Sequence, residues 1–194
     1  MPNTILVTGA SKGLGLFLAD QYLRRGDIVF ALNKTSSAGE KNLIKKFPDR
    51  FFPITCDITS EKQVKKAAAS IAKRFHSIDI LINNAGIHRE KPYTATNEFD
   101  PKIVRETFDT NAVGPLLVTK YFHEFVIRGN KKIFVNISSE AGSISTCWRD
   151  REYGYCMSKA ALNMQSVILQ NKLKPHNVKV LAIHPGWMRT DMGG

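Results

Sequence analysis

A short apolar run at the start of the chain, Thr4 to Thr8, leads directly into a glycine-rich segment, Gly9-Ala-Ser-Lys-Gly-Leu-Gly15. Apolar residues then recur at helical spacing until Gly26. Glycine lets a chain turn sharply between a strand and a helix, and it brings backbone N–H groups close to a phosphate at the helix N-terminus. The segment therefore predicts a strand–turn–helix unit and favours a nucleotide site over a turn that serves packing alone.

The rest of the chain repeats this alternation. Strands are expected over residues 4–8, 27–32, 51–55, 78–82, 132–137 and 178–183, and helices over 14 to about 25, 41–47, 60 to about 76, 101–129 and 155–172. Ser60 and Gln63 have the spacing of a capping box, and Asp100-Pro101 is a typical helix start. The expected fold is a single α/β domain over residues 1–194, with a doubly wound, Rossmann-type parallel sheet and helices on both faces.

Composition agrees with one soluble domain. The chain has 194 residues, of which 43% are hydrophobic and 11 are Phe, enough for a sizeable core. Its apolar runs are far shorter than the roughly 20 residues of a membrane span, and no leader precedes the first strand. The three cysteines (Cys56, Cys147 and Cys156) form neither a disulfide framework nor a zinc spacing. We therefore expect a cytoplasmic protein with no membrane association.

The net charge of +11 raises the alternative of nucleic-acid binding. The excess is spread over both halves of the chain, and neither a recognition module nor interleaved aromatic residues accompany it. A solvated basic surface that attracts an anionic ligand is the interpretation we adopt, with no nucleic-acid partner.

The end of the second expected strand bears on the choice of dinucleotide. A carboxylate there would accept a hydrogen bond from the ribose 2′-hydroxyl, but this chain has Asn33 followed by Lys34, and Lys12 lies within the glycine loop. Two cations without a carboxylate suit a 2′-phosphate and favour NADP(H) over NAD(H). The alternative is that both lysines are merely solvated.

Five further motifs follow in order along the chain. They are Asn83-Asn-Ala-Gly86, Asn111, Asn136-Ile-Ser-Ser139, Tyr155-Cys-Met-Ser-Lys159 and His184-Pro-Gly186. With the glycine loop, this series resembles the short-chain dehydrogenase/reductase family over the whole chain. Within that family, the ending His184 to Gly194 and the stretch Glu152 to Asn163 are most similar to the C-factor and sniffer-type carbonyl reductases.

The resemblance implies a function and a set of site residues. It implies an NADP-dependent reductase that converts a ketone or aldehyde into an alcohol. It assigns the catalytic roles to Asn111, Ser139, Tyr155 and Lys159. The residues expected to bind the cofactor are Gly9, Ser11, Lys12, Gly13, Leu14, Gly15, Asn33, Lys34, Asp57, Ile58, Asn84, Ala85, Gly86, Tyr155, Lys159, Pro185, Gly186, Trp187, Met188 and Thr190. No metal site is expected.

The residue types themselves suit this chemistry. Tyr155 and Lys159 are four residues apart on a helix and share a face. A tyrosine phenol has an ordinary pKa near 10, and an adjacent ammonium together with an oxidised nicotinamide is expected to lower it by ~2–3 units. Ser139 would donate a hydrogen bond to the substrate carbonyl, Tyr155 would protonate that oxygen, and Asn111 would hold a water that links Lys159 to solvent.

Three features lie outside this assignment. The link from Ser139 to Tyr155 is long, as in the subgroup, but its Trp148-Arg-Asp-Arg151 run departs from any familiar pattern. The segments 149–152 and 88–91 are expected to be solvated loops, with a place at the rim of the substrate pocket as the alternative. Relatives of the family continue beyond the Thr190 region, so the chain is expected to lack the C-terminal substrate segment and final strand.

Two questions of partner and role stay open at this point. Paired helices (residues 101–128 and 155–172) imply a homodimer by resemblance, and a monomer is the alternative. A dinucleotide-binding signalling protein of the C-factor type, with incidental turnover, is the alternative to a dedicated reductase.

Overall fold

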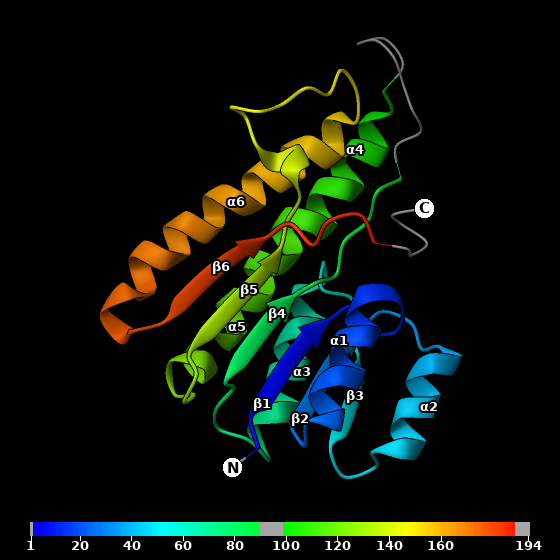
Figure 1. Ribbon diagram of the computed structural model, residues 1–194, viewed down its shortest axis with the longest axis vertical. Coiled ribbons are helices and arrows are strands. Elements are labelled where there is room, and N and C mark those ends of the chain that lie inside the picture. The colour runs from blue at the N-terminus through cyan, green and yellow to red at the C-terminus, as the bar shows by residue number, and fades with distance from the viewer. Residues whose placement is uncertain (1, 90–98, 189–194) are drawn as a thin grey trace.

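A computed structural model of the chain describes residues 2–89 and 99–188. Six parallel strands form one sheet in the order β3-β2-β1-β4-β5-β6 (Figure 1). The strands are β1 (Thr4–Thr8), β2 (Ile28–Asn33), β3 (Phe51–Thr55), β4 (Ile80–Asn83), β5 (Ile133–Ile137) and β6 (Lys179–Ile183). The doubly wound parallel sheet is therefore confirmed, with each strand within two residues of its predicted bounds.

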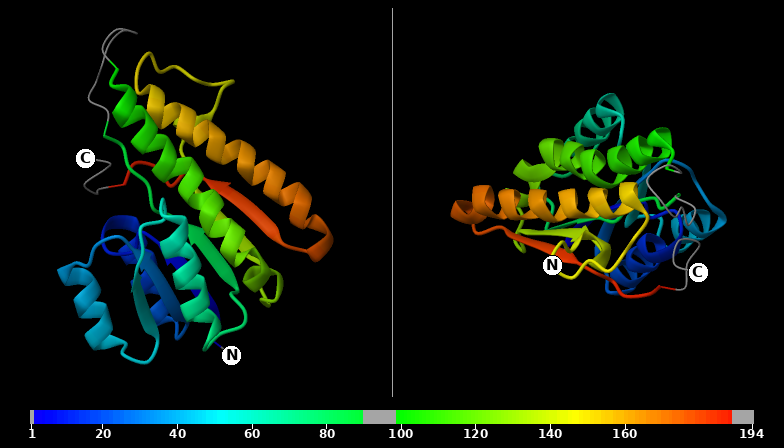
Figure 2. Two further views of the ribbon diagram at one scale, coloured as in Figure 1. Left: turned by 180° about the vertical axis from the view of Figure 1, so that it is seen from behind. Right: turned by 90° about the horizontal axis from the view of Figure 1, so that it is seen from above.

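Helices cover both faces of the sheet. They are α1 (Gly13–Arg24), α2 (Ala38–Lys46), α3 (Glu61–Ala72), α4 (Pro101–Phe108), α5 (Gly114–Ile127) and α6 (Tyr153–Leu173). Right-handed crossovers place α1 and α2 on one face, while α3, α5 and α6 lie on the other, as the view from behind shows (Figure 2). None of the helices within the described ranges is long and apolar enough to cross a bilayer.

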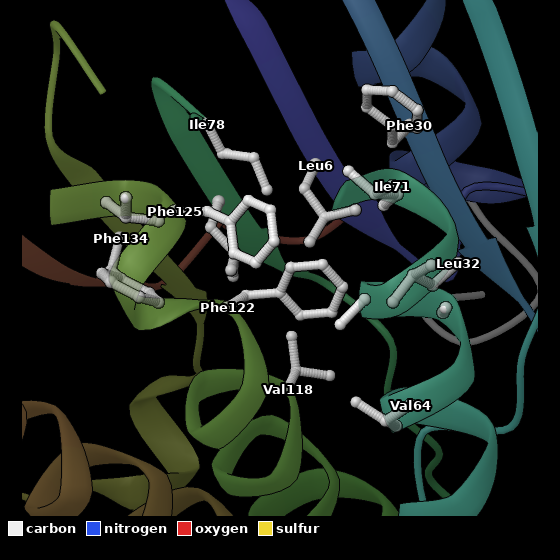
Figure 3. Packing of buried hydrophobic residues seen from close by; sticks show 14 of the residues in the cluster. Leu6, Phe30, Leu32, Val64, Ile71, Ile78, Val118, Phe122, Phe125 and Phe134 are labelled. Carbon is white, nitrogen blue, oxygen red and sulfur yellow. The ribbon is translucent and has the colours of Figure 1, made fainter. Parts of the chain in front are cut away.

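Two apolar clusters lie on opposite faces of the sheet. The larger one joins β1 and β5 to α3 and α5, and Phe122 lies at its centre with no exposed surface (Figure 3). The smaller one packs α1 and α2, through residues such as Leu23 and Leu43, against β1 and β2. Central β1 is buried along its whole length, whereas edge strand β6 is mostly exposed. Two-sided burial explains why the central strands are apolar without alternation.

Local hydrogen bonds correct three helix predictions. The predicted capping box is wrong, because Ser60 makes no side-chain cap and Gln63 accepts from the Asp57 backbone N–H at 2.9 Å instead. Helix α3 ends at Ala72, four residues before the predicted end. Helix α2 begins at Ala38 rather than residue 41, because the Ser37 hydroxyl caps it by accepting from Glu40 N–H at 3.0 Å.

The expected long helix over 101–129 contains an irregular turn. Asp100 caps its start by accepting from the Lys102 N–H at 2.8 Å, as predicted. Between α4 and α5, however, residues Asp109–Val113 form a π-helical turn. Single π-helical turns inside α-helices occur frequently at functional sites. Helix α6 begins two residues before Tyr155, at Tyr153.

Replacing Phe122 with alanine tests the larger cluster. We expect Phe122→Ala to lower the free energy of unfolding by about 3–5 kcal/mol, because it removes a fully buried ring and leaves a cavity. The matched control is Phe17→Ala on α1, whose side chain is 57% exposed and whose loss should cost less than about 1 kcal/mol. Urea denaturation of both variants measures the difference, and equal costs would contradict this description of the core.

Candidate active site

The sheet reverses its strand order between β1 and β4, and hydrogen bonds join the carboxyl ends of these two strands. The Asn84 amide donates to the Thr8 carbonyl at 2.9 Å and to the Gly9 carbonyl at 3.1 Å. The buried Thr8 hydroxyl accepts from the N–H groups of Asn84 and Ala85, both at 3.0 Å. Ligands of doubly wound sheets bind at such a reversal point. The predicted site residues after β1 and β4 therefore lie together.

The glycine loop runs from β1 into the first turn of α1. Gly9 and Gly13 have φ angles of +68° and +56°, which side chains disfavour. A Cβ on Gly15 would lie 2.4 Å from the Gly9 carbonyl oxygen, so only glycine lets α1 approach the loop this closely. Lys12 makes no side-chain cap, and the first turn of α1 carries no acidic residue. The N–H groups at this helix end thus fit an anionic ligand such as a pyrophosphate.

At the end of β2, the side chain of Asn33 contacts the glycine loop. The side chain of Asn33 is buried, with its carbonyl oxygen accepting from the Ala10 N–H at 2.6 Å and its amide donating to Glu40. Its predicted contact with the cofactor remains a prediction. Lys34 is largely exposed and forms a 2.6 Å ion pair with Asp57. Burial would raise the pKa of Asp57, but the hydrogen bonds from Lys34 and Thr59 outweigh it and the pKa is lowered.

Asn111 is a buried residue in the π-helical turn. Its amide oxygen accepts from the Ile87 N–H at 2.8 Å, and its amide nitrogen donates to the Ile87 carbonyl at 2.9 Å and to the Ser158 hydroxyl at 3.1 Å. The residue therefore ties the segment after β4 to the turn and to α6. A Cβ on Gly86 would lie 3.2 Å from the Asn111 oxygen and 3.8 Å from Lys159 Nζ. The predicted water contact of Asn111 remains a prediction.

Ser139, Tyr155 and Lys159 come together where β5 ends and α6 begins. Ser139 and Tyr155 are joined by a side-chain hydrogen bond. Lys159 is 6% exposed, and its Nζ donates to the Ile137 carbonyl at 2.8 Å and lies 5.7 Å from the Tyr155 ring centroid. A Cβ on Gly142 would lie 2.6 Å from the Lys159 carbonyl carbon, so the turn after Ser139 packs directly on α6. The structure thus unites three of the four predicted catalytic residues in one cluster.

Burial dominates the electrostatics of this cluster. It lowers the pKa of Lys159 to about 8. It raises the pKa of Tyr155 above the ordinary value, against the opposing effects of Ser139 and Arg149. In the protein alone, desolvation disfavours the charged form of both groups, and the lowering of the phenol pKa by Lys159 together with an oxidised nicotinamide remains a prediction. Both side chains are held mainly in the protonated state at neutral pH.

The remaining residues predicted to bind the cofactor lie either in the segment after β6 or in the packed interior of the domain. Pro185, Gly186, Trp187 and Met188 follow β6, where Gly186 has a φ of +77° and Trp187 is 81% exposed. Thr190 lies outside the described residues. Ile58 is 5% exposed, and a Cβ on Gly114 would lie 2.7 Å from its Cδ1, so this side chain packs against α5.

Charged side chains beside Ser139 and Tyr155 were not predicted as site residues. The Ser139 hydroxyl donates to Glu140 at 2.6 Å, and Arg149 forms ion pairs with Glu140 and Glu152. Segment 149–152 was expected to be a solvated loop, but the Arg149 side chain is only 12% exposed. The signal in the sequence was the alternation of positive and negative side chains from Arg149 to Glu152. Within this run, Arg149 forms an ion pair with Glu152 instead of being solvated. Residues 90 and 91 of the other expected loop lie outside the described residues.

The chain is similar to known proteins over nearly its whole length. A family model described as short chain dehydrogenase matches residues 3–194. The short-chain dehydrogenase anuI of Penicillium roqueforti is 32% identical over 206 residues, which cover 98% of this chain and 80% of the relative. The C-signal protein of Myxococcus xanthus is 37% identical over 117 residues, covering 60% of this chain and 69% of the relative.

Two solved structures are similar over the full chain. The NADPH-bound carbonyl reductase from chicken fatty liver is 31% identical, with a TM-score of 0.89, and 79% of it is covered. The carbonyl reductase Sniffer of D. melanogaster is 27% identical, with a TM-score of 0.89, and 84% of it is covered. The resemblance predicted from the motifs is confirmed by these matches.

The carboxyl group beside Ser139 provides a test by acid titration. Burial would raise the pKa of Glu140, but hydrogen bonds from Ser139 and Arg149 and the charge of Arg149 lower it to about 2. A lowered pKa stabilises the fold above the ordinary value of 4.5, and that stabilisation disappears as the pH falls toward 2. We therefore expect Glu140→Gln to be less stable than the wild type above pH ~5, with the difference shrinking at lower pH.

Urea denaturation at several pH values measures this effect. The matched control is Glu124→Gln, which removes an exposed i,i+4 ion pair with Arg128 and should change stability little. His184 Nδ1, 3.5 Å from Glu140, also faces the carboxylate, so His184→Gln is measured in parallel. A difference between Glu140→Gln and the wild type that grows with acid would overturn the prediction.

Proposed function

We propose, since this chain belongs to the short-chain dehydrogenase family, that it is an NADPH-dependent reductase that converts a ketone or aldehyde into an alcohol. The observation that carries the proposal is the hydrogen bond between Tyr155 and Ser139, with the buried ammonium of Lys159 behind it. The printed names of the chicken and Drosophila structures describe carbonyl reductases, and the first of these contains NADPH. The same reaction class is proposed for this chain.

The cofactor would occupy the carboxyl ends of the strands. The N–H groups at the start of α1 would face its pyrophosphate, and Asp57 would face its adenine side. Lys34, after β2, and Lys12, in the glycine loop, would face the expected 2′-phosphate, which favours NADPH as the cofactor. The segment from Pro185 onward would hold the nicotinamide, which supplies the hydride when bound.

The chain's own residues supply the proton and the oxyanion contacts. Tyr155 donates its phenolic proton to the carbonyl oxygen of the substrate, while Ser139 stabilises the developing negative charge by a hydrogen bond. The Lys159 ammonium stabilises the tyrosinate left behind, because the two groups share one face of α6.

The protonation states found in the structure suit reduction. Burial keeps the phenol protonated at neutral pH, which is the form that a general acid needs. With its pKa lowered to about 8, Lys159 carries its proton at pH 7 and loses it under mildly alkaline conditions. Reduction is therefore supported at neutral pH and weakens as the pH rises.

Removal of the Tyr155 hydroxyl tests the catalytic assignment. We expect Tyr155→Phe to lower kcat for reduction by about 10²-fold or more, because the proton donor is lost. The dissociation constant for NADPH should change little, since the ring is retained. Stopped-assay kinetics with a panel of aldehydes and ketones, together with calorimetric titration of NADPH, measure both quantities. Retained turnover would refute the role of the tyrosine, and NADPH binding without turnover in the wild type would favour a signalling role.

Two lysine variants test the choice of dinucleotide. Lys34→Ala and Lys12→Ala should weaken NADPH binding by about tenfold while NADH binding changes little, because a charged phosphate contact contributes about 1.5–3 kcal/mol before solvent screening. Lys172→Ala, on the far end of α6, is the matched control. Calorimetric titration with each dinucleotide gives the ratio. An equal loss for both would show that the lysines act elsewhere, for example through the Lys34–Asp57 ion pair.

A further inference from the structure

Arg149 occupies an unusual place for a residue in a connecting segment. Its guanidinium donates from Nη2 to Glu140 at 2.5 Å and from Nη1 to Glu152, on either side of the link between β5 and α6. This link is drawn in yellow in Figure 1. Arg149 is the most buried partner of both ion pairs. A guanidinium that bridges two carboxylates in this way holds both in fixed positions, because its donors have a rigid planar geometry.

The first of these carboxylates controls a catalytic hydroxyl. Ser139 has one proton, and that proton is donated to Glu140 at 2.6 Å. The oxygen of Ser139 accepts from the Ala141 N–H at 3.2 Å, and its hydroxyl also pairs with the Tyr155 phenol, whose pKa it lowers. Ser139 must turn its proton away from Glu140 in order to donate to a substrate carbonyl. The charge of Arg149 weakens the hold of Glu140 on that proton, because the carboxylate is already neutralised.

The second carboxylate reaches the catalytic tyrosine from the other side. Glu152 Oε1 lies 3.1 Å from His88 Nε2, and the His88 ring stacks on the Tyr155 ring with a centroid separation of 4.4 Å and an interplanar angle of 26°. Glu152 itself has φ +64° and ψ +45°, a left-handed conformation that is unfavourable for a residue with a side chain. Such strain persists where surrounding contacts hold the residue, and it is concentrated at functional sites.

These contacts connect six side chains, from the Ser139 hydroxyl at one end to the Tyr155 ring at the other, and the pairing of Ser139 with Tyr155 closes them into a ring. The ring runs through Ser139, Glu140, Arg149, Glu152, His88 and Tyr155. We propose that Arg149 is a positioning residue of the reductase: by bridging Glu140 and Glu152 it orients the Ser139 hydroxyl and the Tyr155 ring for proton transfer. The proposal rests on the proposed function, and it assigns a role to the Trp148–Arg151 run that no motif explains.

Arg149→Met tests the proposal, because methionine retains much of the length of the side chain without its charge or donors. We expect kcat to fall by about tenfold or more, since a small misplacement of a catalytic group is sufficient for such a loss. KM and the dissociation constant of NADPH should change much less. Arg149→Lys should recover part of kcat, because it retains the charge but not the double bridge. Unchanged kcat in Arg149→Met, or full recovery of kcat in Arg149→Lys, which lacks the double bridge, would overturn the proposal.

Two further variants separate positioning from general loss of structure. Lys120→Met removes a comparable ion pair, with Glu61, on an exposed surface of α5 and should leave kcat unchanged. Glu152→Gln breaks one arm of the ring without removing Arg149, so it tests the proposal if Arg149→Met fails to fold. A loss of kcat in Glu152→Gln supports the ring, whereas wild-type kcat in this variant contradicts it.

A second readout needs no substrate and stays informative if the proposed function fails. The absorbance titration of the Tyr155 phenol is obtained as the difference between a protein and its Tyr155→Phe derivative. The groups that face this phenol are Ser139, Glu140, Arg149, Cys156, His88 and Lys159. Loss of the Arg149 charge should raise the phenol pKa further, because that charge lowers it in the wild type. An unchanged phenol pKa in Arg149→Met would show that Arg149 does not act on Tyr155.

Discussion

The hydrogen bonds between Asn84 and the end of β1 are the constraint on which the rest of the site depends. They join two parallel strands at the point where the strand order reverses, and they are made by side-chain and backbone groups that would be costly to bury unpaired. Each hydrogen bond contributes only about 1 kcal/mol, but together they fix the position of the glycine loop relative to the segment after β4. The π-helical turn then attaches to that segment through the two bonds between Asn111 and Ile87.

Desolvation and ion pairing act in opposite directions around Ser139, Tyr155 and Lys159. Burial removes the water that would stabilise a tyrosinate or an ammonium, so it raises the pKa of Tyr155 and lowers that of Lys159. Farther along the link, Glu140 is kept ionised because Ser139 and Arg149 compensate the loss of water. The result is a site with a neutral proton donor next to a fixed negative charge. Such a division of protonation states between neighbouring groups is how one site supports acid catalysis at neutral pH.

The sequence predictions were accurate where they depend on a local pattern of residues. They failed where a contact with a residue outside that pattern decides the structure. Strand β1 (residues 4–8) was predicted at its observed bounds, because an apolar run buried along its whole length is a local pattern. The capping box at Ser60 failed because Gln63 bonds instead to Asp57, a choice made by the loop geometry before α3. The sign of the π-helical turn in the sequence was Asn111 itself, which is a poor helix former. The turn was not predicted, because its stabilising partner, Ile87, is 24 residues away.

From the sequence alone came the strand–helix alternation, the family resemblance and the prediction that Ser139, Tyr155 and Lys159 are catalytic, because each depends on residue type and spacing along the chain. The tertiary structure decided which partners the charged side chains between β5 and α6 contact. Arg149 could be recognised as charged but not as buried between two carboxylates, because that depends on how the segment between β5 and α6 folds back on itself. It also decided the pKa of Tyr155, since desolvation is a property of the surroundings and not of the motif.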